Sequence, residues 1–328
     1  MRGKRQRRDA QLFELDLMSN ILSLNAKLAS RTYRHSGYHA FSVFDPKPRQ
    51  IHKASVEDRV LHRAVYRMLY PFFDRTFIAD SYSCRIGKGT HKALNRFRDM
   101  ALKASSNHTR TCWVLTCDVS KYFASIDQTV LMSILAKRIH DQNIMWLLGE
   151  IIRSFSSTCP DVGLPLGNLT SQLFANVYLN KLDQFMKHRL KVSCYARYAD
   201  DFAILSDSRA YCESLADPIR AFLWDELRLL LHPRKVRLQS LASGVDFLGW
   251  IHFPDHRVLR SSTRRRMFRN LEIIGGNENS IHSYLGLLLH GNANRLRAKV
   301  VRLKARYKSD GNLSFVRSFG YPLHNIYE

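Results

Sequence analysis

The chain has 328 residues, of which 45% are hydrophobic and 24% charged, so it is a globular protein of one large domain or two of ordinary size. Its 51 Lys and Arg residues against 28 Asp and Glu residues give a net charge of +23, which indicates a polyanion binder and makes nucleic acid the expected partner. No apolar stretch approaches the ~18 residues of a transmembrane helix, and the start lacks the apolar core of a signal peptide, so we expect a cytoplasmic protein without a membrane partner.

The first third of the chain predicts helices around one pair of strands. Residues 1–35 contain a basic lead and then a helix, because apolar residues recur there at a roughly helical period. Residues 41–54 are typical of a strand, a Pro-containing turn and a second strand. A long helix is predicted from residue 56, with a break forced by Pro71.

The remaining chain alternates strands and helices. Residues 112–117, CWVLTC, predict a short apolar strand that ends on Asp118. Helices are predicted over 128–155, over 209–228 and after the Gly/Pro loop that opens 163–190, and single strands over 231–239 and 244–253. The tail from residue 257 has 14 Lys and Arg against four Asp and Glu, which favours helices with a basic face. This order predicts an α+β fold with an antiparallel sheet.

Cysteines and histidines give no sign of a structural metal. The six cysteines are scattered without a C-x-x-C pair, so neither a zinc site nor a disulfide framework is indicated. We expect them to be ordinary buried thiols.

Two adjacent acids interrupt an apolar and aromatic run. The segment YARYADDFAIL, residues 195–205, has β-forming residues on both sides of Asp200 and Asp201, which predicts a hairpin with the acids at its tip. Adjacent carboxylates repel each other, and their desolvation costs several kcal/mol unless a cation or hydrogen-bond donors compensate. A hairpin turn in solvent is the plain alternative.

Asp118 supplies a third acid at the end of an apolar strand. Two Mg²⁺ ions ~3.5–4 Å apart, bridged by such carboxylates, suit an in-line phosphoryl transfer in which a 3′-hydroxyl attacks and pyrophosphate leaves. The three acids therefore predict a site for two Mg²⁺ ions, with Mn²⁺ as a possible substitute.

Several motifs together resemble reverse transcriptases over about residues 41–260. Their order along the chain is DPKPRQI, SYSCRIGKGTHKAL, Asp118 with an aromatic residue five positions later, GLPLGNLTSQLFANVYL, YADD, LHPRKVRL and GVDFLGW. The resemblance implies a right-hand polymerase with fingers, a palm whose antiparallel sheet carries helices on one face, and a helical thumb. Fingers and palm would occupy residues 1–255, with a basic N-terminal extension over about 1–35, and a basic thumb would occupy 256–328.

The resemblance also implies roles for the acids and their neighbours. Asp118 and Asp200 would be the main metal ligands, and Asp201 a supporting acid. Lys235 matches a lysine close to the departing pyrophosphate. Phe123 matches the steric gate that stacks under the deoxyribose and excludes a 2′-hydroxyl, although a core aromatic is an open alternative.

Basic finger residues and a hydrophobic turn complete the implied site. The residues resembling those that contact the incoming triphosphate or the template are Lys47, Arg49 and Arg85. For the first two, solvated surface charge is an equally open interpretation. The residues resembling the primer grip are Phe247, Leu248 and Gly249, where the glycine would allow close backbone approach.

One loop departs from the group II intron and retron pattern of P-Q-G followed by S-P. Here the sequence has Pro165-Leu166-Gly167 and then Ser171-Gln172. This variant resembles reverse transcriptases of diversity-generating retroelements, which misincorporate opposite template adenines and work with a small basic accessory protein. Unlike Gln, Leu166 can only pack, so a polar check on base-pair geometry would be lost. Plain loop packing is the alternative.

The predicted function is an RNA-directed DNA polymerase that binds template RNA, the RNA/cDNA duplex and dNTPs, and is error-prone at adenines. With 328 residues, we expect no further domain beyond the thumb. The first alternative is a defence-associated or other group II intron-like bacterial reverse transcriptase. A non-catalytic RNA-binding protein is disfavoured by the presence of all three acids and Phe123, and a membrane-surface protein by the lack of Trp in the basic tail.

Overall fold

The computed structural model describes residues 6–44, 48–273 and 277–309. The chain forms two compact units whose segments alternate along the sequence. Unit 1 comprises residues 1–89, 117–202 and 213–236, and unit 2 comprises residues 90–116, 203–212 and 237–328.

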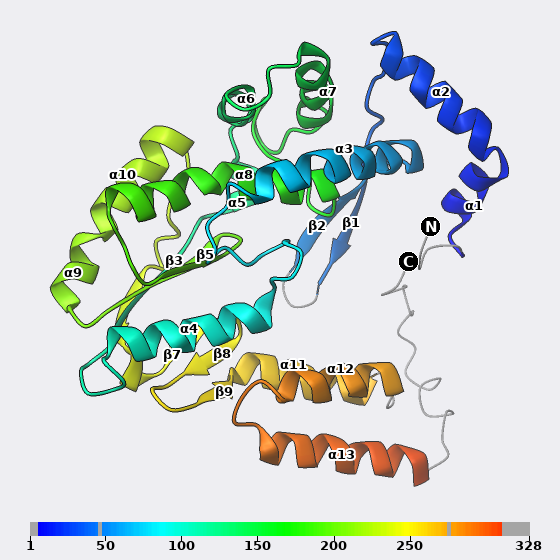
Figure 1. The fold of residues 1–328 in the computed structure, drawn as a ribbon. Helices are drawn as coiled ribbons and strands as arrows, with labels where there is room; N and C mark the ends of the chain where they lie inside the picture. Colours follow the sequence, from blue (N-terminus) through cyan, green and yellow to red (C-terminus); the bar gives the residue numbers. More distant parts are fainter. Residues whose placement is uncertain (1–5, 45–47, 274–276, 310–328) are drawn as a thin grey trace. The chain divides into compact units, whose positions relative to one another are not determined.

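Unit 1 begins with helices and a strand pair (Figure 1). Its first elements are α1 (Arg8–Leu15), α2 (Leu17–Ala29), β1 (His39–Val43), β2 (Arg49–Lys53) and α3 (Val56–Asp74). β1 and β2 pair antiparallel, with Phe41 opposite Ile51. The two strands predicted over residues 41–54 are confirmed, whereas the turn predicted between them includes residues 45–47, which lie outside the described residues. The helix predicted within residues 1–35 is confirmed over Arg8–Leu15 and Leu17–Ala29, and residues 1–5 of the basic lead are not described.

α3 begins at a side-chain cap and continues past a proline. Ser55 Oγ accepts a hydrogen bond from Asp58 N at 3.1 Å and donates one to Asp58 Oδ2 at 2.7 Å, which satisfies an N–H group of the first turn. The predicted break at Pro71 is wrong, because the helix runs on to Asp74. Pro71 lies in the last turn, so its ring removes a hydrogen bond only at the helix end.

α8 is the buried central helix of unit 1. The remaining helices of this unit are α5 (Tyr122–Ser125), α6 (Gln128–Ala136), α7 (Gln142–Arg153), α8 (Leu169–Gln184), the π-helix η1 (Phe185–Arg189) and α10 (Ala216–Leu227). α8 is buried on most of its surface, including the polar Asn176 and Asp183, and α3 lies beside it (Figure 1). A helix that is buried nearly all round belongs to a core, so α8 supports the elements that cover it.

Four strands form one sheet of order β4-β5-β3-β6. They are β3 (Trp113–Asp118), β4 (Tyr195–Tyr198), β5 (Asp201–Ser206) and β6 (Arg237–Ser240), and α9 (Arg209–Ser214) follows β5. β4 and β5 are neighbours joined by Ala199 and Asp200, which confirms the predicted hairpin. The strand predicted over 231–239 is mostly wrong, because only its last three residues are extended and Pro233 belongs to a turn.

Unit 2 combines a small sheet with helices. Besides α4 (Thr90–Ala104) it contains η2 (Leu241–Ser243), β7 (Val245–Phe247), β8 (Trp250–His252), β9 (Arg257–Leu259), α11 (Ser261–Ile273), α12 (Glu278–Leu288) and α13 (Asn294–Ser309). The single strand predicted over 244–253 is wrong, because Leu248 and Gly249 turn the chain between β7 and β8. Both turn residues have positive φ, 52° and 83°, as a two-residue hairpin loop of type I′ requires.

A separate hydrophobic core holds the helical tail to this small sheet. Trp250 of β8 packs with Met267, Leu271 and Ile281 of the helices that follow. The α+β class is therefore confirmed. Helices predicted in the tail are confirmed over Ser261–Ile273, Glu278–Leu288 and Asn294–Ser309, and residues 310–328 lie outside the described part of the chain.

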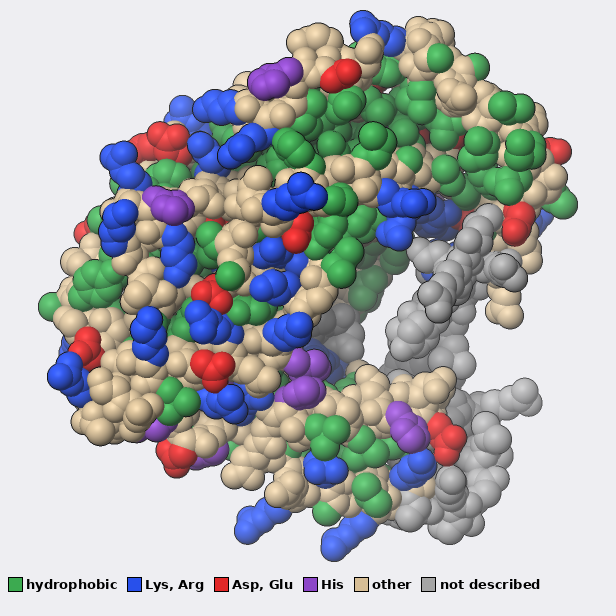
Figure 2. Space-filling view, viewed as in Figure 1, with side chains coloured by type: hydrophobic (Ala, Val, Ile, Leu, Met, Phe, Trp, Pro, Cys, Tyr) green, Lys and Arg blue, Asp and Glu red, His purple; other side chains and the backbone are tan. Residues whose placement is uncertain are grey.

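Lys and Arg side chains are spread over the face drawn in Figure 2. Cys84 and Cys159 are exposed, so the expectation of buried thiols holds only for the other four cysteines. Among residues 6–44, 48–273 and 277–309, no helix has the length and apolar character needed to cross a membrane.

Candidate active site

The end of β3 and the turn of the β4–β5 hairpin meet in unit 1. Val119 N donates to Asp200 O at 3.4 Å, and His232 N donates to Asp118 O at 2.8 Å. These backbone contacts place Asp118 between the hairpin turn and the segment that carries Lys235. Asp118 is only 7% exposed, so its carboxylate lies in a region of low solvent access.

Two of the three acids, Asp200 and Asp201, have raised pKa values. Burial is the largest cause that raises the pKa of Asp201, to about 8, followed by hydrogen bonding to Asp118 and the negative charges of Asp200 and Asp118. Burial also raises the pKa of Asp200, and the charge of Asp118 adds to the rise while Lys235 and Arg49 oppose it. The cluster therefore favours a bound proton or cation.

Lys235 supplies a positive charge directly. Its Nζ lies 2.6 Å from Asp118 Oδ2, and 40% of its side chain is exposed. The ammonium group reaches the acid from the solvent side. Arg49, exposed on β2, acts on Asp200 through its charge, so β2 also contributes to the potential at the hairpin.

The donor chemistry of the acids fits a hard divalent cation. Carboxylate oxygens are the ligands that Mg²⁺ and similar ions prefer, and a cation would remove the repulsion that raises the two pKa values. In the described part of the chain, no three Asp, Glu, His or Cys side chains converge closely enough to form a metal-binding group by themselves. The acids would hold a metal together with oxygens of the substrate, as Mg²⁺ sites in phosphoryl transfer do.

The predicted gate residue lies on α5, directly after β3. Phe123 is half-buried, and its carbonyl accepts a hydrogen bond from Leu164 N at 2.7 Å. Lys121, before the helix, has a φ of 45°, which turns the chain sharply after Asp118. Phe123 therefore lies just after the end of β3, on the far side of a sharp turn.

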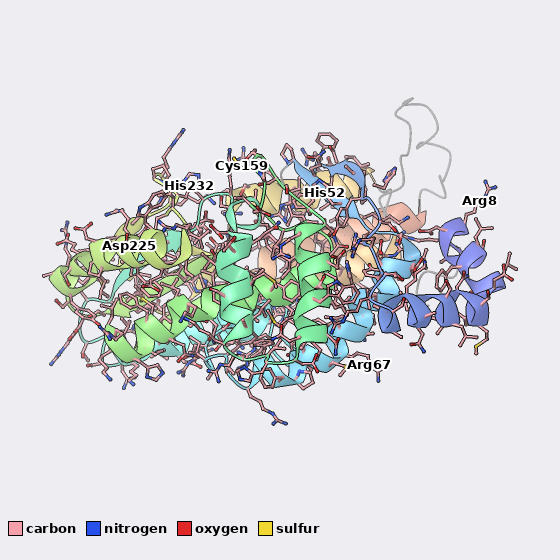
Figure 3. The ribbon with its side chains drawn as sticks, turned by 90° about the horizontal axis from the view of Figure 1, so that it is seen from above. Arg8, His52, Arg67, Cys159, Asp225 and His232 are labelled. Atoms are coloured by element: carbon pink, nitrogen blue, oxygen red, sulfur yellow. The ribbon has the colours of Figure 1, made fainter. Side chains whose placement is uncertain are left out.

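The loop before α8 is joined to β2. His52 of β2 is labelled in Figure 3; its backbone N donates to Leu166 O at 2.9 Å, and Asn168 Nδ2 donates to His52 O at 2.9 Å. Gly167 has a φ of 102°, and a Cβ there would lie 2.7 Å from Ile51 Cγ2, so only glycine fits. Leu166 is half-buried in this loop.

The other predicted nucleotide-binding residues differ in environment. Gln172 is half-buried in the first turn of α8. Arg85 is engaged inside unit 1: its Nε donates to Asp74 Oδ1 at 2.7 Å, and its Nη1 donates to the carbonyls of Ile78 and Ser81. The structure does not gather Arg85 with the acids. Lys47 lies outside the described residues.

The predicted primer-grip residues lie in unit 2. Phe247 is buried and stacks on Phe97, with ring centroids 5.1 Å apart. Leu248 and Gly249 form the β7–β8 turn. A Cβ at Gly249 would meet Thr263 Oγ1 at an ordinary 3.6 Å, so positive φ, rather than close approach, requires glycine here.

Arg197 is a buried charged residue that no sequence pattern singled out. It lies two residues before the hairpin turn and is 0% exposed, and its Nη1 donates to Ala199 O at 3.0 Å. The available signal was an Arg in a strand of otherwise apolar and aromatic residues, which implies a buried partner for the charge.

Residues 44–252 match the family described as "Reverse transcriptase (RNA-dependent DNA polymerase)". The chain belongs to the reverse transcriptase family. Reverse transcriptases generally depend on divalent metals, in agreement with the oxygen ligands of the three acids.

Two curated relatives come from bacteria. "Protein YkfC" of Escherichia coli (strain K12) is 27% identical over 251 residues, covering 64% of this chain and 63% of that protein. "Group II intron-encoded protein LtrA" of Lactococcus lactis subsp. cremoris is 23% identical over 278 residues, covering 64% of this chain and 44% of that protein. The chain spans less than two thirds of the length of these relatives.

Solved telomerase structures share the reverse transcriptase fold. Apo telomerase from Candida tropicalis aligns with a TM-score of 0.54 at 12% identity, covering 85% of this chain and 58% of that chain. Candida albicans telomerase, solved with a TWJ fragment of telomeric RNA, aligns with a TM-score of 0.52 at 12% identity, covering 82% and 55%. At this identity the likeness concerns the fold, which is that of a right-hand polymerase.

Proposed function

We propose that this chain is an RNA-directed DNA polymerase that copies a template RNA into cDNA. The observation that carries the proposal is the gathering of Asp118, Asp200 and Asp201, with the pKa values of the last two raised, in a member of the reverse transcriptase family. Divalent metal ions, Mg²⁺ or Mn²⁺, would activate the primer 3′-hydroxyl and neutralise charge on the leaving pyrophosphate.

Each residue of the site has a proposed task. Asp118 and Asp200 hold the metals, and Asp201 supports them from the start of β5. Lys235 forms an ion pair with Asp118, and its side chain is partly exposed, so its ammonium group can turn toward an anionic pyrophosphate. Arg49 raises the positive potential that draws the incoming triphosphate. The fingers and palm would occupy residues 1–255 and the thumb 256–328.

Asp200→Asn tests this proposal. The change keeps the side-chain shape and removes a ligand's charge, so primer extension on an RNA template should fall by several orders of magnitude, with RNA affinity largely intact. Asp225→Asn, on the exposed surface of α10 (Figure 3), is the matched control and should keep full activity. Extension by the Asp200 variant at the parent's rate would remove the assignment. A parent that binds RNA but extends no primer would instead favour a non-catalytic RNA-binding protein.

We further propose that the polymerase is error-prone at template adenines, as in a diversity-generating retroelement. Leu166 and Gln172 support this, because they stand in place of the Gln and Pro of the other families. The Leu166 backbone is fixed to β2 by a hydrogen bond, so its side chain has a defined position from which it can offer no polar contact. A small basic accessory protein is the partner that this proposal implies.

Leu166→Gln tests the error-prone proposal. One hydrogen bond that forms well only with a correct base pair contributes about 0.5–1.5 kcal/mol, so misincorporation opposite adenine should fall roughly two- to tenfold. Sequencing of cDNA made from a defined RNA measures the rate. Leu230→Gln, at an exposed leucine of unit 1, controls for the substitution itself. An adenine error rate that is low in the parent, or unchanged in the Leu166 variant, would favour a defence-associated or other group II intron-like enzyme.

A further inference from the structure

Arg197 and Asp183 form a fully buried ion pair beneath the catalytic hairpin. Both side chains are 0% exposed. Arg197 Nε donates to Asp183 Oδ1 at 2.7 Å and Nη2 donates to Asp183 Oδ2 at 2.6 Å, so the guanidinium and the carboxylate meet through two parallel hydrogen bonds. This geometry joins β4 to α8 with a fixed orientation.

The remaining guanidinium hydrogens reach three other residues. Nη1 donates to Ala199 O at 3.0 Å and to Asn176 Oδ1 at 3.3 Å, and Nη2 donates to Ser81 Oγ at 3.1 Å. Tyr195 Oη also donates to Asp183 Oδ1, at 2.8 Å. A planar guanidinium has five N–H donors, and here they are all directed at acceptors.

The bond to Ala199 acts on the turn that carries the acids. Ala199 has a φ of 55°, a left-handed conformation that costs a residue with a side chain roughly 1–2 kcal/mol. Such a conformation persists only where its surroundings impose it. Arg197 holds the Ala199 carbonyl from one side, and Val119 N holds the next carbonyl, that of Asp200, from the other.

Stability alone does not explain this buried pair. Replacing a buried ion pair with apolar residues of similar volume is often neutral or stabilising, by about 1–4 kcal/mol. All five N–H donors of Arg197 are used here, and one of them bonds to a strained turn. This arrangement suggests that the pair serves to fix the conformation of the turn.

We propose that Arg197 is a positioning residue that fixes the Ala199–Asp200 turn, so that Asp200 and Asp201 stay in register with Asp118. Asp183 in turn neutralises and orients Arg197. The activity part of this inference rests on the proposed polymerase function, whereas the geometry of the acids can be measured without it.

The first test separates positioning from stability. The triple variant Arg197→Met, Asp183→Leu, Tyr195→Phe replaces three members of the polar cluster with apolar side chains and leaves Asn176 and Ser81 in place. Its melting temperature should stay within about 3 °C of the parent's. Its kcat in primer extension should stay roughly 10- to 100-fold low, because Ala199 O lacks its donor. A triple variant that keeps the melting temperature and the kcat of the parent would overturn the positioning role of Arg197.

The second test uses a variant that keeps the charge. Arg197→Lys still neutralises Asp183, but one ammonium cannot hold both carboxylate oxygens and Ala199 O. Its kcat should fall with little change in melting temperature, and Tyr195→Phe, which leaves the Arg197–Ala199 bond in place, should change kcat by less than about threefold. A lysine variant with parental kcat would overturn the proposal even if the triple variant does not fold.

The third readout does not require polymerase activity. Mn²⁺ binding in the presence of a nucleoside triphosphate, followed by electron paramagnetic resonance, reports the arrangement of the acids, and the Mn²⁺ affinity should weaken roughly 10- to 100-fold in Arg197→Lys. Equal Mn²⁺ affinity in the folded variant and the parent would overturn the positioning role. If the parent binds Mn²⁺ but makes no cDNA, the proposed function is wrong. The comparison of Mn²⁺ affinity between parent and variant would still test the positioning role.

Discussion

At the scale of single residues, two neighbouring rings after β3 have different environments. Tyr122 is 3% exposed and its Oη donates to Ala175 O at 2.5 Å, so it packs as a core aromatic. Phe123 is half-buried, with its ring centroid 5.5 Å from that of Tyr122. The core interpretation therefore suits Tyr122, and Phe123 remains available to contact a nucleotide.

Phe123→Ala should let the polymerase accept ribonucleotides. Removing the ring opens space where a 2′-hydroxyl would otherwise clash, so the ratio of kcat/KM for a dNTP over the matching rNTP should fall by at least about tenfold, the effect of 1.4 kcal/mol in discrimination. Single-nucleotide extension with each substrate measures the ratio. Phe72→Ala, at an exposed ring on α3, is the control. Undiminished rejection of rNTPs would show that Phe123 is a packing residue.

Local sequence predicts some site residues better than others. An Asp at the end of an apolar strand projects from the edge of the sheet. The sequence could therefore predict that Asp118 belongs to the same site as the acids of the hairpin. Long side chains are different, because their partners come from distant segments. Arg85 bonds to Asp74, and Arg197 bonds to Asp183 and Asn176, and no spacing along the chain indicates those pairs.

At the scale of elements, alternation and helical period predicted the hairpin and most helices because both patterns are local. The errors have physical causes. Pro71 sits where a helix tolerates the loss of one hydrogen bond. The β7–β8 turn uses Leu248 in a left-handed conformation that leucine seldom adopts, so no Asn-Gly signal marked it. β9 has three residues, too few for a pattern.

The β7–β8–β9 sheet should lose stability below neutral pH through His252. Burial and the charge of Arg257 lower the pKa of His252 to about 4, whereas an unfolded His titrates near 6.5. Between those pH values the unfolded state binds more protons than the folded state. The stability that neutral His252 contributes is therefore fully present above about pH 6.5 and is lost as the pH falls toward 4. The free energy of unfolding should drop by about 1.4 kcal/mol per pH unit for this residue.

Chemical denaturation at several pH values between 7 and 5 measures this slope. His252→Phe should flatten it, since the ring already packs against Phe97 with centroids 4.5 Å apart. His62, whose pKa is also lowered to about 4, keeps its own contribution in that variant. His140→Gln, at an exposed position, should leave the slope unchanged, and an equal slope in the His252 variant would refute the assignment.

At the scale of the whole molecule, the net charge of +23 exceeds what solubility requires. Acidic side chains are fewer than basic ones on the face in Figure 2, so that face has an excess of positive charge. A surface of this kind attracts a polyanion before any specific contact forms.

RNA affinity should therefore depend steeply on salt. If six phosphates are engaged, counterion release predicts a loss on the order of 10³-fold in affinity between 50 and 200 mM salt. Titration of labelled RNA at several salt concentrations gives the slope, and Arg49→Gln should reduce it by about one contact. An RNA affinity that does not change with salt concentration would show that the net positive charge does not serve RNA binding.

The backbone bonds between β2 and the loop at Leu166 bear on engineering by segment exchange. His52 bonds to both Leu166 and Asn168, and Gly167 packs against Ile51. The paired strands β1 and β2 and this loop are therefore held together as one structural unit. A loop transplanted alone from another reverse transcriptase would lack the strand to which it bonds. Residues 39–53 and 165–168 should therefore be exchanged together.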